Sequence, residues 1–218
     1  MSITFEDKNS KHTFVMAKDN PTADHILIYG IFEWPLIVWC KQFSDKHKLF
    51  LDIGSHMGTY SILLSDYFEE VHSFEPQKST FEYMCNGIGL NDKTNIIPHN
   101  VALGNLENRS TLHKISADGG GSTLLKRDNC SVETVDVRTL DSFNLSNIGF
   151  IKIDVEGFEL EVLEGSVETL TRSHFPKFIF ESWNGNKKLR DKLFTRISEI
   201  GYEIIRLQNT TDMFLAIH

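Results

Sequence analysis

The stretch LFLDIGSHMGTY, residues 49–60, decides the fold. It places an apolar run, an acidic residue and two glycines directly before a predicted helix. A strand that runs into a glycine-containing turn and a helix typically holds a ligand at the carboxyl end of the strand. The ligand to be identified is therefore a dinucleotide, a phosphate, or a molecule that presents no phosphate to this turn.

The composition indicates a single globular domain. The chain has 218 residues, of which 40% are hydrophobic and 24% are charged, and these values are ordinary for such a domain. The formal net charge of −8 disfavours nucleic-acid binding, because that binding depends on clustered lysine and arginine. Three widely spaced cysteines without a CxxC motif are typical of a reducing compartment.

Neither a targeting segment nor a membrane span is indicated. Residues 1–11 lack the basic and apolar regions of a signal peptide. The most apolar segment, residues 26–39, contains Glu33 and Pro35 and is shorter than the roughly 20 residues of a membrane span. We therefore expect a soluble, cytoplasmic protein without a membrane span; the sequence leaves its oligomeric state open.

From residue 49 onward, short β-rich runs alternate with helical stretches. Strands are expected at residues 49–54, 69–76, 149–157 and 177–183, with a further strand and the loop beyond it at 94–103 and a closing hairpin at 202–207 and 212–218. This alternation predicts an α/β fold with a doubly wound, mostly parallel sheet, to which the hairpin adds one antiparallel strand.

Two segments lie outside that alternation. The first 48 residues are expected to form an N-terminal helical flank or lid, ahead of a ligand-binding domain at 49–218. Two further β-like runs, at 110–115 and 132–137, predict a β insertion at about residues 105–140. This insertion would lie over the carboxyl ends of the strands, where open α/β sheets bind ligands.

The glycine turn does not match either common phosphate-binding loop. The dinucleotide fingerprint is GxGxxG, but here Gly54 and Gly58 are separated by three residues and position 56 is His56. The glycine that lets a pyrophosphate approach the backbone is therefore missing. A Walker loop needs GK[ST], and the Gly58-Thr59-Tyr60 sequence does not supply it.

Two acidic residues indicate a nucleoside with an ammonium-bearing tail. Glu75 ends the second predicted strand, 21 residues after Gly54, where a carboxylate can accept hydrogen bonds from ribose hydroxyls. Asp52 is unusual in a buried strand and must find donors; an ammonium group would suit it, directly or through water. Together they favour S-adenosylmethionine. Each feature also has a purely structural alternative. The glycine turn would be an ordinary turn before a helix, and Glu75, beside Pro76, would be an acidic residue stabilised by the dipole at the N-terminus of the next helix.

The motifs resemble those of the FkbM-type family of S-adenosylmethionine-dependent methyltransferases. The resemblance covers residues 49–218 and rests on LDIGSHMGTYS, FEP, NVALG, VRTLDSF, IKIDVEGFELEVLEG and FIFES. It implies a class I methyltransferase fold, which is Rossmann-like with a seven-stranded sheet. It also implies methylation of a hydroxyl oxygen on a polyketide or sugar.

Site residues carry over from this resemblance position by position. The methionine end of the cofactor would lie against Asp52, Gly54, Ser55 and Gly58, the ribose against Glu75, and the adenine beside Asn100 and Val101. His56 departs from the family, which more often has Asn there. The full cofactor-binding set is Asp52, Gly54, Ser55, His56, Gly58, Tyr60, Ser61, Glu75, Pro76, Asn100, Val101 and Asp154.

Methylation of a hydroxyl needs a base, and carboxylates at the fourth strand are the candidates. Lys152, Asp154 and Glu156 would share one side of an extended strand. Glu181 ends the next strand and reaches the same rim, so the predicted catalytic set is Asp154, Glu156 and Glu181. Trp183 would form an apolar wall against a sugar.

Three alternatives to this catalytic interpretation stay open. Glu156 and Gly157 would simply cap the next helix, or Lys152 and Asp154 would form a buried ion pair. The carboxylates also suit a divalent metal, although no spacing requires one and no metal site is assigned. The triple glycine of GGGSTLL, residues 119–125, predicts a mobile loop over the site or a flexible surface linker.

The preferred function is therefore O-methylation of a hydroxyl on a sugar or glycan, of deoxysugar type. The partner would be a small-molecule or glycan acceptor, and nucleic acid is not expected. A polyketide-like acceptor is the first alternative. A non-catalytic nucleoside-binding module or an NAD-binding Rossmann domain is the second.

Overall fold

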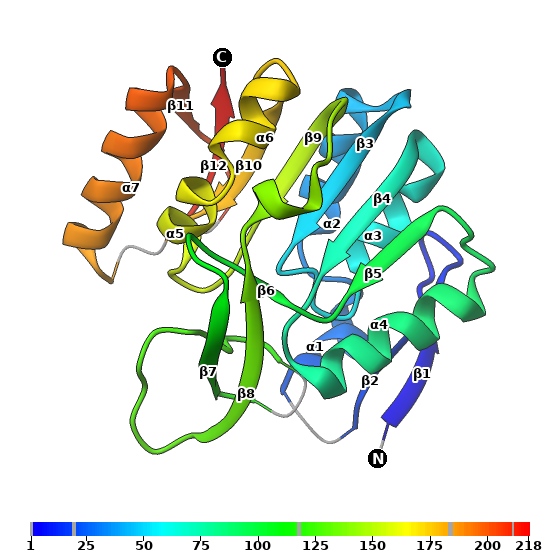
Figure 1. Cartoon of the computed structure of the whole chain (residues 1–218). Coiled ribbons are helices and arrows are strands. Elements are labelled where there is room, and N and C mark those ends of the chain that lie inside the picture. Colours follow the sequence, from blue (N-terminus) through cyan, green and yellow to red (C-terminus); the bar gives the residue numbers. More distant parts are fainter. Residues whose placement is uncertain (1, 19–20, 117–118, 183–184, 211) are drawn as a thin grey trace.

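The computed structural model describes residues 2–18, 21–116, 119–182, 185–210 and 212–218. A seven-stranded sheet forms its centre, with helices on both faces, and a three-stranded and a two-stranded sheet lie beside it (Figure 1). The predicted doubly wound, mostly parallel α/β fold is confirmed. Within the described part of the chain, no single helix is both long and apolar enough to cross a membrane, although residues 22–29 and 34–43 reach the limit as a bent pair.

The main sheet has the order that brings the glycine turn to its middle. Its strands, in spatial order, are β11 (Glu203–Arg206), β12 (Met213–Ile217), β10 (Lys177–Glu181), β9 (Ile148–Ile153), β3 (Asp45–Ile53), β4 (Phe68–Phe74) and β5 (Ile96–His99). The run from β10 to β5 is parallel, and β12 is antiparallel to both of its neighbours. The closing hairpin thus adds the one antiparallel strand that the sequence predicts.

Alternation along the central strands separates two cores. On β3, Phe50 packs into one core, while Leu51 and Ile53 pack into the other. The first core is covered by α1 (Pro21–Tyr29), α2 (Trp34–Cys40), α3 (Thr59–Leu64) and α4 (Lys78–Leu90), and the second by α5 (Glu159–Glu164), α6 (Val167–Arg172) and α7 (Lys187–Ile200). Short 3₁₀ helices lie at Lys41–Phe43, Ser65–Tyr67 and Leu140–Phe143.

The N-terminal flank is not wholly helical, so that expectation is wrong for its first part. Strands β1 (Ser2–Glu6) and β2 (Thr13–Ala17) form an antiparallel hairpin, and only then do α1 and α2 follow. The hairpin is held to the end of α4, where Asn91 exchanges hydrogen bonds of 2.9 and 2.6 Å with the backbone of Thr13. Because four consecutive residues of β2 are buried, this strand lacks the alternation by which a half-buried strand is identified.

Two predicted segments each contain two elements in the structure. In residues 94–103, where a strand and the loop beyond it are expected, the strand ends at His99, and the following β6 (Ala102–Leu103) joins the insertion, beside β8 (Ser131–Arg138) and β7 (Asn108–Lys114). The helical stretch that follows the predicted strand at 149–157 is divided into α5 and α6 at Gly165 and Ser166, which both have low helix propensity. Figure 1 shows β7 and β8 extending beyond the main sheet.

Candidate functional site

A cavity of about 520 Å³ opens at the carboxyl ends of the parallel strands, which is a usual size for a small-molecule site. Three parts of the chain form its wall. The sheet contributes the turn after β3, the end of β4 and the segment after β9; the other two parts are the N-terminal flank and the insertion loop. Its polar lining includes Thr22, Glu33, Ser55, His56, Thr59, Tyr60, Glu75, Ser122, Thr123, Lys152, Asp154, Glu156 and Glu181.

The glycine turn is pressed against the neighbouring strand. Gly54 has a φ of 76°, and a Cβ atom there would lie 1.8 Å from the backbone oxygen of Asp154. The backbone N–H groups of Gly54 and Ser55 both donate to the oxygen of Phe74, at 3.0 Å. The turn is thereby fixed between β4 and the segment after β9, and Gly54 and Ser55 line the cavity.

His56 contributes to the site through its backbone and its conformation. Its φ of 53° is left-handed, a region in which Asn and His are enriched among residues other than glycine. This preference accounts for both the His here and the Asn expected from the resemblance. The His56 N–H donates to Oε2 of Glu75 at 3.0 Å, and the residue lines the cavity.

Glu75 is held rigidly at the end of β4. Its Oε1 accepts from the backbone N–H of Gln77 at 2.8 Å and its Oε2 from that of His56. Burial raises the pKa of Glu75 to about 7. The side chain of Asn100 donates to the backbone oxygens of Glu75 and Pro76. Asn100 therefore supports this segment from behind, whereas Pro76 and Val101 line the cavity.

Asp52 lies beneath the turn and not on the cavity wall. It is fully buried, and its Oδ2 accepts hydrogen bonds from the backbone N–H and the hydroxyl of Ser61, at 3.0 and 2.5 Å. Its Oδ1 faces Nζ of Lys152 at 3.9 Å. Asp52, Gly58 and Ser61 therefore join Asn100 as the members of the predicted cofactor set that do not line the cavity; Asp52 and Ser61 hold the start of α3 in place.

Lys152 connects the turn to the candidate catalytic residues. Asp52 and Lys152 are direct neighbours across β3 and β9. The ammonium group of Lys152 donates to the backbone oxygen of Gly54 at 3.0 Å and lies 3.1 Å from the carboxylate of Asp154. Burial alone would lower the pKa of Lys152, but Asp154 and Asp52 outweigh it and raise the pKa. The ion pair between Lys152 and Asp154, which the sequence left open as an alternative, is therefore present, and both residues line the cavity.

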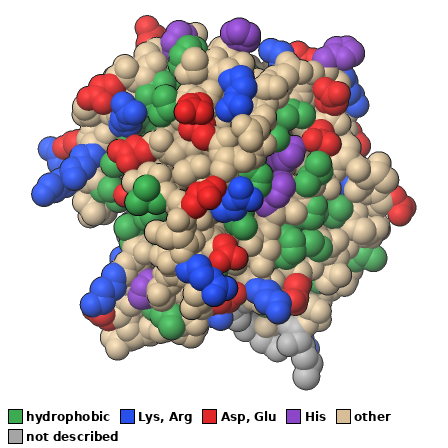
Figure 2. All heavy atoms as spheres, viewed as in Figure 1, with side chains coloured by type: hydrophobic (Ala, Val, Ile, Leu, Met, Phe, Trp, Pro, Cys, Tyr) green, Lys and Arg blue, Asp and Glu red, His purple; other side chains and the backbone are tan. Residues whose placement is uncertain are grey.

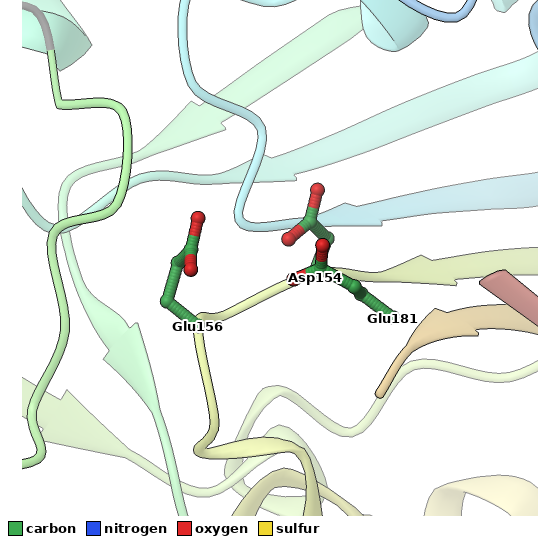
Figure 3. A group of neighbouring side chains, drawn as sticks. All are labelled: Asp154, Glu156 and Glu181. Carbon is green, nitrogen blue, oxygen red and sulfur yellow. The ribbon is translucent and has the colours of Figure 1, made fainter. Parts of the chain in front are cut away.

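Asp154, Glu156 and Glu181 gather at the ends of β9 and β10 (Figure 3). Each offers a carboxylate oxygen within 4.8 Å of the others. Burial and the charges of Asp154 and Glu156 raise the pKa of Glu181 to about 9. A cluster of this kind shares a proton, and its oxygen atoms also suit a divalent cation.

The route that brings Glu156 to this cluster differs from the prediction. Strand β9 ends at Ile153, and Glu156 has a left-handed φ of 57°, so simple alternation along an extended strand is wrong at this residue. The reason is Glu159, whose buried carboxylate accepts from the backbone N–H groups of Val155 and Gly157 at 3.2 and 3.1 Å. Glu159, and not Glu156, organises the turn before α5.

The insertion loop reaches over this cluster. The hydroxyl of the buried Thr123 donates to the backbone oxygen of Glu156 at 2.8 Å, and that of Ser122 donates to the side chain of Gln77 at 2.8 Å. These bonds tie the described part of residues 119–125 to both sides of the cavity, in place of a free surface linker. Trp183, expected as an apolar wall, lies outside the described residues.

Sequence reasoning missed the residues that come from the N-terminal flank. Thr22, Phe32 and Glu33 line the cavity, and the hydroxyl of Tyr60 donates to Oε2 of Glu33 at 2.9 Å. Glu33 is a single acidic residue before Trp34 and Pro35 and belongs to no recognisable motif. It is also far from the glycine turn in the sequence, so the sequence does not indicate that the two are in contact.

Comparison with known proteins gives one family match. Residues 52–204 match the model of the methyltransferase FkbM domain. The hexuronic acid methyltransferase AglP of Haloferax volcanii is 25% identical over 143 residues, which are 61% of this chain and 55% of the relative. The chain thus spans about half the length of that curated relative.

Solved structures show the same fold. The methyltransferase FkbM of Methylobacillus flagellatus KT has a TM-score of 0.60 at 22% identity, covering 79% of this chain and 44% of that one. A protein from Streptococcus mutans, described as a methyltransferase and solved with S-adenosylhomocysteine, has a TM-score of 0.54 at 12% identity, covering 86% of this chain and 100% of that one. These similarities support the class I methyltransferase fold.

Proposed function

Because the chain belongs to the methyltransferase FkbM domain family, we propose that it is an S-adenosylmethionine-dependent O-methyltransferase acting on a sugar or glycan hydroxyl. The observation that carries this proposal is the composition of one cavity. A rigidly held carboxylate, Glu75, ends β4 beside a turn without a pyrophosphate glycine, and a carboxylate cluster lies at the adjacent strand ends.

The residues present fit this cofactor. The described lining residues include five carboxylates and a single lysine, which suits a ligand with net positive charge. S-Adenosylmethionine carries a sulfonium and an ammonium group against one carboxylate, and it supplies the methyl group to be transferred. Glu75 would receive the ribose hydroxyls, while Gly54 and Ser55 would lie along the amino-acid tail.

The three carboxyl groups of the cluster differ in protonation and in partners, and these differences favour a different role for each in the reaction. Glu181 has a pKa of about 9, so near neutral pH it keeps a proton and can donate a hydrogen bond to the acceptor. The carboxylate of Asp154 is already engaged in the ion pair with Lys152. Burial raises the pKa of Glu156, so its carboxylate takes up a proton more readily than an ordinary one. We therefore assign Glu156 as the base for the acceptor hydroxyl.

A sugar acceptor is supported by the chemistry of the wall. Carboxylates accept hydrogen bonds from neighbouring hydroxyls, and the half-exposed ring of Phe32 provides an apolar surface on the same cavity. The resemblance to a hexuronic acid methyltransferase agrees with this choice. On the face shown in Figure 2, acidic and basic side chains are interspersed, an arrangement that suits a small acceptor better than a nucleic-acid backbone.

Binding of S-adenosylhomocysteine tests the cofactor. At about 100 times its dissociation constant, this ligand should stabilise the chain by about 2.7 kcal/mol, which corresponds to a rise in Tm of roughly 5–10 °C. NAD should leave the Tm unchanged, because the turn lacks the pyrophosphate glycine. Differential scanning fluorimetry measures both. A rise with NAD and none with S-adenosylhomocysteine would indicate a dinucleotide-binding module instead.

The Glu156→Gln variant tests the base. Turnover of an acceptor found by screening sugars with labelled donor should fall about 100-fold, because the amide cannot take the hydroxyl proton. Binding of S-adenosylhomocysteine, measured by calorimetry, should stay within about twofold. The exposed Glu168→Gln change on α6 is the control for lost charge and should leave turnover intact. Equal losses of binding and turnover in Glu156→Gln would contradict the assignment.

A further inference from the structure

Glu33 brings a carboxylate to the cavity from outside the segment that matches the family model. It immediately precedes α2, lines the cavity together with Gly54 and Ser55, and lies outside the matched residues 52–204. The hydroxyl of the buried Tyr60 donates to its Oε2 at 2.9 Å. Tyr60 belongs to the first turn of α3, so Glu33 is fixed beside the glycine turn.

The backbone of Glu33 is held in an unfavourable conformation. Its φ of 56° and ψ of 21° are left-handed, a region that glycine and asparagine adopt more readily than glutamate. Strained residues of this kind persist where the surrounding structure holds them, and they cluster at ligand sites. The left-handed backbone of Glu33 at the cavity wall therefore agrees with a role in a ligand site.

The other carboxylates around the turn already have partners. Asp52 is bound by Ser61 and faces Lys152, and Asp154 is paired with Lys152 at 3.1 Å. Glu75 is held by two backbone N–H groups at the end of β4. Among the described residues, the ion pairs within 4.0 Å do not include Glu33. It accepts a hydrogen bond from the neutral hydroxyl of Tyr60, and the charge of Lys152, which is paired with Asp154, acts on it from a longer distance.

We propose that Glu33 binds the α-ammonium group of the methyl donor, so that the N-terminal flank completes the pocket for the amino-acid tail. This inference rests on the proposed function and names a residue that the family segment does not contain. Tyr60 orients the carboxylate through one oxygen, and the other oxygen accepts from the ammonium group. The role first expected for Asp52 thus passes to a residue on the cavity wall.

Two ligands that differ in the tail test this inference. S-Adenosylhomocysteine carries the ammonium group, whereas 5′-methylthioadenosine has the same nucleoside and a thioether but no amino-acid tail. In calorimetry, the Glu33→Gln variant should bind S-adenosylhomocysteine at least tenfold more weakly than the wild type, because a charge-assisted hydrogen bond is lost. Its affinity for 5′-methylthioadenosine should stay within about twofold.

Two further variants make the result interpretable. Glu203→Gln removes one negative charge from an exposed position on β11 and should change neither affinity. Glu33→Asn removes the carboxylate with a residue that accepts the left-handed backbone, so it should give the same tail-specific loss even if Glu33→Gln folds poorly. Circular dichroism and the melting temperature check the fold of each.

The outcomes separate the two levels of the proposal. If the wild-type chain binds neither S-adenosylhomocysteine nor 5′-methylthioadenosine, both the proposed function and this inference are wrong. If the wild type binds both ligands and the Glu33 variants keep both affinities or lose both equally, only the role of Glu33 is wrong. A loss confined to S-adenosylhomocysteine supports it.

Discussion

Replacing Gly54 by alanine is expected to abolish S-adenosylhomocysteine binding and to lower the free energy of unfolding by about 3 kcal/mol or more. The new methyl group would lie 1.8 Å from the backbone oxygen of Asp154, at a residue whose φ is 76°. Neither a side-chain rotation nor a small shift relieves this clash, because the obstacle is backbone. The turn must therefore separate from the segment after β9. Urea unfolding measures the stability change, and calorimetry measures the binding.

Gly89→Ala is the matched control for this substitution. A Cβ atom at Gly89 would meet nothing within 4 Å, and the residue is exposed near the end of α4. Alanine there should raise stability by about 0.5–1 kcal/mol without affecting binding. If the Gly54→Ala chain bound S-adenosylhomocysteine as the wild type does, the close packing of the turn would not be required for the site.

Replacing Lys152 by methionine is expected to lower the free energy of unfolding by about 3–5 kcal/mol near neutral pH. Lys152 is buried, and its ammonium group is the cation beside the fully buried Asp52. Methionine occupies a similar volume but leaves that carboxylate without a charge partner. The backbone oxygen of Gly54 also loses its hydrogen bond from Lys152. Urea unfolding again gives the measurement.

The destabilisation in Lys152→Met should depend on pH in a defined direction. Burial raises the pKa of Asp52 in the folded chain, and loss of Lys152 raises it further. A carboxyl group with a raised folded-state pKa favours folding below its unfolded value of about 3.9, and this contribution is lost as pH rises towards the folded value. The variant should therefore lose less stability at about pH 5 than at about pH 8.

The double variant Asp52→Asn, Lys152→Met identifies the origin of the effect. Removing the carboxylate should recover part of the stability lost in Lys152→Met and should remove most of the added pH dependence. If the double variant were as unstable and as pH-dependent as the single one, the unpaired charge of Asp52 would not be the cause.

Much of the fold is predictable because its signals are local. The apolar runs of the parallel strands and the helical spacing of α4 and α7 are visible within windows of about a dozen residues. The N-terminal hairpin lacks such a signal, because four consecutive residues of β2 are buried and only alternate ones, Phe14 and Met16, belong to the first core. The break after His99 depends on a second sheet that forms only when residues far apart meet.

The position of a site residue is predictable where the residue ends a strand. It is less predictable where a turn or a distant segment of the chain determines that position. Glu75, Asp154 and Glu181 follow from the rule that parallel strands present their carboxyl ends at one edge. The position of Glu156 depends on Glu159, and that of Asp52 on Lys152 across the sheet. Glu33 approaches only through tertiary packing against Tyr60.

Different parts of the chain form different parts of the cavity wall, and this division has an evolutionary consequence. The sheet forms the half around Glu75 and the glycine turn, while the N-terminal flank and the insertion loop form the remainder. Under the proposed function, the sheet binds most of the methyl donor, and the N-terminal flank adds Glu33 for the ammonium group of its tail. Exchange of Phe32 and of the insertion loop around Thr123 would then change the acceptor, while Glu33 and the residues of the sheet continue to bind the same donor.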